Sequence, residues 1–77
     1  MELSEAAKSY VFQDGEYAGK KPSEMLDEYQ VIMLMGYLLR CSWVSSEVKN
    51  IYKELLEYSK NKFEWVRYIL KQYETKI

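Results

Sequence analysis

The residues best suited to chemistry form a short segment rich in glycine and lysine in the first third of the chain. Gly15 and Gly19 are separated by three residues, and Lys20 and Lys21 follow directly. A Walker phosphate-binding loop needs four residues between its glycines and a Ser or Thr after the lysine, so this spacing does not predict nucleotide hydrolysis. The spacing favours a pair of turns in which both glycines adopt positive φ angles.

The other reactive side chains do not form a catalytic set. The chain has no histidine, which excludes Ser-His-Asp, Cys-His and His-ligated zinc chemistry within it. Two acidic pairs, Asp14 with Glu16 and Asp27 with Glu28, offer too few ligands for calcium, and we interpret them as solvated charges. Cys41 follows a predicted helix end, where the helix dipole disfavours a thiolate. We therefore predict no enzyme activity, no metal site and no cofactor.

The composition is typical of a small folded protein. The chain has 77 residues, of which 48% are hydrophobic and 30% are charged, and we expect one domain over residues 1–77. Its net charge of −1 creates no field that attracts nucleic acid or anionic lipid. The acidic start differs from a signal peptide, and no apolar run reaches the about 20 residues of a membrane span. These features predict a cytoplasmic protein that does not associate with membranes.

A motif-like series runs from the first glycine into an apolar segment: Gly15-x-Tyr17-x-Gly19-Lys20-x-x-Ser23-Glu24-Met25, followed by Tyr29. It resembles the glycine-tyrosine-glycine-lysine motif in the C-terminal domain of the exodeoxyribonuclease X family and in its small stand-alone relatives from phages and bacteria. The similarity covers residues 10–58, although the family usually has Phe where this chain has Asp14. The resemblance implies a compact accessory module of phage or mobile-element type, without catalytic residues of its own.

Aromatic residues indicate that the chain binds another protein. In the last predicted helix, Trp65, Tyr68 and Gln72 lie on one side, and Trp43 occupies a connector between two earlier helices. Large aromatic side chains on a surface act as anchors because they contribute contact area at little entropic cost. We predict that these four residues bind a partner protein and modulate it, for example by inhibition. Cover by a neighbouring helix or by the N-terminal segment is the competing interpretation.

Nucleic-acid binding is the alternative function. Tyr17 supplies a ring on which a base could stack, and Lys20 and Lys21 supply ammonium groups for phosphates, as in proteins that bind single strands. Against this hypothesis, the basic residues of the later helices alternate with acidic ones, so no continuous basic face forms.

The last predicted helix also carries a seam of apolar residues at steps of three and four. The seam consists of Phe63, Val66, Leu70 and Tyr73. Such spacing resembles the contact positions of a coiled coil, although two heptads are too few to define one. A homodimer through this seam and packing of the seam into the domain's own core are both open interpretations.

The elements that must position these residues are predicted to be mainly α-helical. Ser4 can cap a short first helix, and residues 10–18 form a small hairpin or loop. Three helices follow, at about 24–40, 46–59 and 61–76. Ser23 is the expected cap of the first, and Ser45 or Ser46 can cap the second. The first is apolar around nearly its whole circumference, so we expect it to be buried on most sides, with partial cover by a partner as the alternative. The predicted fold is a small N-terminal hairpin or loop packed on a three-helix core.

Overall fold

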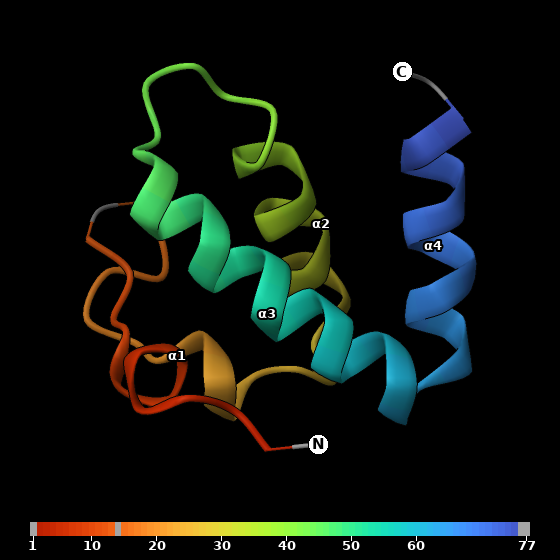
Figure 1. Cartoon of the computed structure of the whole chain (residues 1–77), viewed down its shortest axis with the longest axis horizontal. Coiled ribbons are helices and arrows are strands. Elements are labelled where there is room, and N and C mark those ends of the chain that lie inside the picture. Colours follow the sequence, from red (N-terminus) through yellow and green to blue (C-terminus); the bar gives the residue numbers. More distant parts are fainter. Residues whose placement is uncertain (1, 14, 76–77) are drawn as a thin grey trace.

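The chain folds into helices joined by short loops (Figure 1). The structure is a computed structural model that describes residues 2–13 and 15–75, with side chains described up to residue 71. Its elements are α1 (Glu5–Ser9), the 3-10 turn η1 (Pro22–Glu24), α2 (Tyr29–Leu38), α3 (Ser46–Lys62) and α4 (Glu64–Thr75). No strand occurs within the described residues, so the N-terminal segment is a loop rather than a hairpin. The prediction of a mainly α fold with a three-helix core is confirmed.

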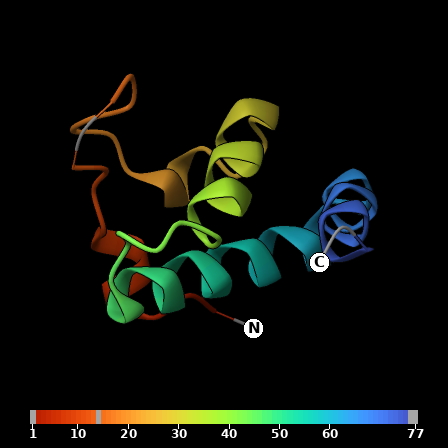
Figure 2. The same ribbon diagram turned by 90° about the horizontal axis from the view of Figure 1, so that it is seen from above.

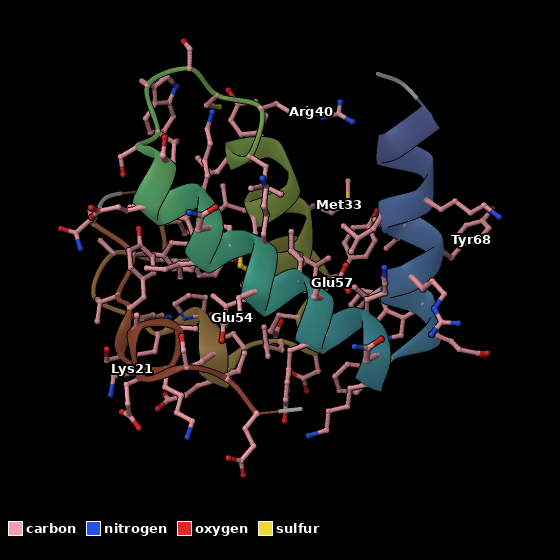
Figure 3. The ribbon with its side chains drawn as sticks, viewed as in Figure 1. Lys21, Met33, Arg40, Glu54, Glu57 and Tyr68 are labelled. Atoms are coloured by element: carbon pink, nitrogen blue, oxygen red, sulfur yellow. The ribbon has the colours of Figure 1, made fainter. Side chains whose placement is uncertain are left out.

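Helix α3 holds the other helices together. It contacts α1, α2 and α4, whereas α2 and α4 meet over a smaller area. Figure 2 shows α2 and the N-terminal loop on the same side of α3, with α4 at its far end. Ser4, directly before α1, attaches the N-terminal part of the chain to α3, because its hydroxyl donates to the Glu54 carboxylate at 2.8 Å. Glu54 lies on the face of α3 next to α1 (Figure 3).

The core is built from apolar side chains of every helix and of the N-terminal loop. Its buried members are Ala7, Phe12, Leu26, Val31, Ile32, Met35, Leu38, Cys41, Tyr52, Leu55, Leu56 and Val66. Helix α2 is buried or half-buried over most of its circumference, as expected from its apolar sequence. The exception is a strip that carries Tyr29 and Tyr37, whose side chains are each 57% exposed.

Helix α2 is shorter than predicted and begins at Tyr29 rather than near residue 24. The expected N-cap, Ser23, instead donates its hydroxyl to the carbonyl of Lys8 at 3.0 Å. Met25 then leaves the helical region with φ −128° and ψ 29°, and Leu26 is buried in the core. Contacts between distant segments thus outweigh the local capping signal.

The remaining helix ends follow local signals more closely. The Ser4 and Ser45 hydroxyls accept backbone N–H groups three residues later, at 3.2 Å and 3.3 Å, and so cap α1 and α3 as predicted. Ser59 does not interrupt α3, which continues to Lys62. Phe63 alone separates α3 from α4, because its φ of −128° and ψ of 120° are extended rather than helical.

Ser59 is the one polar side chain buried in the described part of the chain. Its exposed fraction is 0%, and its hydroxyl donates to the carbonyl of Leu26 at 2.9 Å. This bond joins α3 to the segment before α2, 33 positions away in the sequence. A buried carbonyl that loses its donor retains the cost of its dehydration, so this hydrogen bond contributes to the stability of the fold.

We expect Ser59→Ala to lower the free energy of unfolding by about 1–3 kcal/mol, because the buried Leu26 carbonyl would lose this donor. Urea denaturation followed by circular dichroism measures the change. Ser42→Ala is the matched control, since Ser42 is exposed in the connector between α2 and α3 and should change stability by less than about 0.5 kcal/mol. Equal effects of the two substitutions would contradict the role assigned to Ser59.

Candidate functional site

An apolar groove with a volume of about 890 Å³ lies on the described surface. Its lining residues belong to the N-terminal loop, to α2, to the connector before α3 and to the first half of α3, and Figures 1 and 2 show how these segments are arranged. Its aromatic lining residues are Tyr10, Phe12, Tyr17, Tyr37, Trp43 and Tyr52. Its aliphatic lining residues are Met33, Leu34, Leu38, Val44 and Val48. We call this feature the aromatic groove.

Two tyrosines of the lining are hydrogen-bonded to each other, and with Phe12 they form what we call the floor of the aromatic groove. The hydroxyls of Tyr10 and Tyr52 lie 2.9 Å apart and share a hydrogen bond, and their rings meet edge to face with centroids 5.5 Å apart. The buried ring of Phe12 lies next to both, with centroid separations of 6.2 Å. In this bond one hydroxyl donates and the other accepts, so both oxygens have a partner and the floor presents mainly apolar ring surface.

The N-terminal loop forms one wall of the groove and is attached to α2. The Tyr17 hydroxyl donates to the side-chain oxygen of Gln30 on α2 at 3.0 Å. The loop itself closes at Phe12, whose N–H donates to the Lys20 carbonyl and whose carbonyl accepts the Gly19 N–H, both at 3.0 Å. Gly15 and Gly19 both have a φ of +84°, as the sequence predicts for these turns. The N-terminal loop is therefore fixed by its own backbone hydrogen bonds and by a side-chain hydrogen bond to α2.

The rim of the groove carries two exposed rings. Trp43 is 68% exposed in the connector, and Tyr37 is 57% exposed on α2. The connector turns through a backbone hydrogen bond from Val44 to the carbonyl of Cys41 at 3.3 Å, and the buried Cys41 thiol donates to the Tyr37 carbonyl at 3.5 Å. Interaction with the Cys41 thiol, mainly through hydrogen bonding, also raises the pKa of the Tyr37 phenol above its ordinary value. The phenol is therefore neutral at physiological pH.

The structure separates the residues predicted to bind a partner. Trp43 lines the aromatic groove, whereas Trp65 and Tyr68 border a shallow hollow on α4. Trp65 is half-buried and stacks on Tyr29 of α2 at a centroid distance of 6.3 Å, so α2 covers part of it. Tyr68 is 67% exposed and points away from the rest of the molecule (Figure 3). The side chain of Gln72 lies outside the described residues.

Of the three residues predicted to bind nucleic acid, Tyr17 and Lys20 lie close together. The Lys20 ammonium is 6.0 Å from the centroid of the Tyr17 ring, within range of a cation–π contact. Lys20 and Lys21 are exposed and border a separate hollow of about 600 Å³ with Glu24 and Met25. Lys21 projects on the α1 side of the molecule, far from Tyr68 (Figure 3). The two lysines thus lie outside the lining of the aromatic groove.

The seam of the last helix packs mainly inward. Val66 is completely buried, and Phe63 and Leu70 are partly buried against the same core. The side chain of Tyr73 lies outside the described residues. The described part of the seam therefore supports packing into the chain's own core, and Val66 offers no surface for a second copy.

Sequence reasoning missed most of the aromatic groove. Tyr52 lies 42 positions from Tyr10, so the sequence does not show that they are neighbours. Tyr37 was expected to be covered as part of an apolar helix. The available signal was the aromatic content of 16% with eight tyrosines, which is more than so small a core can hide. That signal indicates an exposed aromatic surface without giving its place.

Comparison of the chain with family models, with curated proteins and with solved structures returned no match. The resemblance to the accessory domain of exodeoxyribonuclease X therefore stays a prediction from the motif around Gly15 and Gly19. Between residues 2 and 13 and between 15 and 75, no helix has the length and apolar character needed to cross a membrane. The same residues contain no group of three or more side chains arranged to hold a metal ion.

Substitutions at Gly19 test whether the turn of the N-terminal loop depends on a positive φ angle at this position. A Cβ at this position would meet no atom within 4 Å, so substitution by Ala adds backbone strain at positive φ without a clash. We expect Gly19→Ala to lower the free energy of unfolding by about 1–2 kcal/mol and Gly19→Asn to lower it less, because Asn tolerates this conformation better. Thermal melts of both variants measure the difference. Equal stability of Gly19→Ala and the parent chain would show that the turn does not depend on this φ angle.

Proposed function

We propose that this chain is a small interaction module that binds a partner protein in the aromatic groove and modulates it. One observation supports the proposal: the largely exposed rings of Trp43 and Tyr37 line an apolar groove with a volume of about 890 Å³. Single exposed aromatic residues are common on protein surfaces, but a concave cluster of them is typical of a binding site. The role needs no catalytic side chain.

The organisation of the groove favours binding without large rearrangement. The Tyr10–Tyr52 and Tyr17–Gln30 hydrogen bonds pair the hydroxyls of three lining tyrosines within the chain. A partner that covers these rings therefore leaves each of these oxygens with a hydrogen bond, and it gains the burial of apolar area. Rigid, preformed surfaces also lose less entropy on binding than mobile ones do.

The proposal retains Trp43 as a partner contact and moves the centre of binding from α4 to the groove. Tyr68 and Trp65 form a second, flatter aromatic surface, which lacks a comparable floor. Covering a functional surface of the partner would be enough to inhibit it, which accords with the inhibitory role expected from the sequence. The phage or mobile-element setting is part of the proposal on the strength of the Gly15–Lys20 motif alone.

Trp43→Ala and Tyr68→Ala form a matched pair, because both rings are about two-thirds exposed but only Trp43 lines the groove. We expect Trp43→Ala to weaken partner binding by at least about 2 kcal/mol, or about thirtyfold in Kd, as loss of an anchoring aromatic does. Tyr68→Ala should bind like the parent chain. Affinity capture with the three tagged chains, followed by titration of a captured protein, measures both effects.

Circular dichroism melts of these variants provide the control for folding. Both side chains are exposed, so neither substitution should shift the melting transition. Loss of binding in Tyr68→Ala but not in Trp43→Ala would move the site to α4 and contradict the groove assignment.

Nucleic-acid binding is a second candidate, supported by the Lys20 ammonium beside the Tyr17 ring. Two phosphate contacts, from Lys20 and Lys21, would give a slope of about −1.4 for log affinity against log salt on a single strand. Fluorescence anisotropy with labelled DNA and RNA measures this slope. If the groove proposal is correct, we expect no such binding at low or near-physiological salt. Salt-sensitive binding that is lost in Lys20→Glu/Lys21→Glu, but kept in the charge-matched Lys53→Glu/Lys62→Glu, would favour nucleic acid instead.

A further inference from the structure

The charges around the aromatic groove are uneven. Eleven Lys and Arg residues occur in the chain, yet none is among the described residues that line the groove. Glu16, in the exposed turn of the N-terminal loop, is the only acidic or basic side chain among the described residues that line the groove. The Tyr37 phenol on the rim adds no charge at neutral pH, and its pKa lies above the ordinary value of a tyrosine. The described lining therefore combines aromatic rings with one carboxylate.

Aromatic rings and a carboxylate favour the same kind of ligand. The face of an aromatic ring carries negative electrostatic potential and attracts a cation, most strongly when water is excluded. One ring of this groove already does so within the chain, since the Lys20 ammonium lies 6.0 Å from the centroid of Tyr17. The rings of Trp43 and Tyr37 are 68% and 57% exposed, so a ligand can reach them. Glu16 would add charge complementarity at the edge.

We propose that the aromatic groove recognises an arginine side chain flanked by apolar residues in a short segment of the partner protein. Arginine fits better than lysine, because its planar and weakly hydrated guanidinium can stack on the rings of Trp43 and Tyr37. Apolar neighbours of the arginine cover the aliphatic wall, including Leu34 and Val48. The volume of about 890 Å³ lies within the range of pockets that enclose one drug-sized ligand, which suits a short peptide segment. This inference rests on the proposed function.

A displayed library of random linear peptides, selected on the immobilised full chain, tests the inference directly. Selection on the Trp43→Ala chain in parallel removes peptides that bind elsewhere. We expect the peptides specific to the parent chain to share an arginine between apolar residues. A synthetic peptide of this kind should bind about tenfold more tightly than its counterpart with citrulline, the uncharged isostere, in place of arginine.

Two variants of the chain test the role of the carboxylate. Glu16→Gln should weaken binding of the arginine peptide several-fold at low salt and leave the citrulline peptide unaffected. Glu2→Gln removes the same charge from an exposed position outside the groove lining and should bind both peptides like the parent chain. Melting curves of all variants confirm that each is folded.

The other outcomes separate this inference from the proposed function. Selection of apolar or acidic peptides that depend on Trp43, or equal binding of the arginine and citrulline peptides, would overturn the arginine inference and leave protein binding in the groove intact. Failure to select any peptide that depends on Trp43 would overturn the inference and the groove assignment together. Sedimentation at two concentrations identifies a further occupant: a dimer that dissociates in Trp43→Ala would mean that a second copy fills the groove.

Discussion

The hydrogen bond from the Ser59 hydroxyl to the Leu26 carbonyl is the constraint on which the arrangement of the other elements depends. It fixes the segment before α2 against the C-terminal part of α3 and buries Leu26 beside it. Because this segment is held in a non-helical path, α2 begins only at Tyr29. Helix α2 in turn carries Gln30, which accepts the hydrogen bond from the Tyr17 hydroxyl of the N-terminal loop. A buried polar contact thus helps to place the segment that leads into one wall of the groove.

Apolar packing and hydrogen bonding have different roles within the groove. Phe12 is buried and packs its ring against Tyr10, Tyr17 and Tyr52, which gives the N-terminal loop an anchor in the core. The same ring cluster would be costly if the tyrosine hydroxyls were unpaired, and the Tyr10–Tyr52 bond removes that cost on the floor. The inner rings therefore maintain the loop, and the outer rings of Tyr37 and Trp43 stay exposed, as the proposed binding requires.

Local signals in the sequence were sufficient to predict the mainly α fold, the caps at Ser4 and Ser45, and the turns at the two glycines. Each of these depends on residues a few positions apart, where propensity and hydrogen bonding act directly. The start of α2 could not be predicted, because the Ser23 hydroxyl binds a carbonyl 15 positions away instead of capping. The groove could not be predicted either, since four separate segments build it. Trp43 was identified from its residue type and its connector, but the rings around it were not.

The near-neutral charge of the chain determines how such a module can be selective. With eleven basic and twelve acidic residues, it has no strong field to steer a partner from a distance. Association should then proceed at the modest rate of an unsteered encounter, and differences in affinity should appear mainly in the rate of dissociation. Contacts that act only at short range, such as rings around a cation and a single carboxylate at the edge, suit this condition, because they discriminate after docking. The exposed Tyr68 on α4 lies on a separate surface, so the proposed binding in the groove does not depend on it.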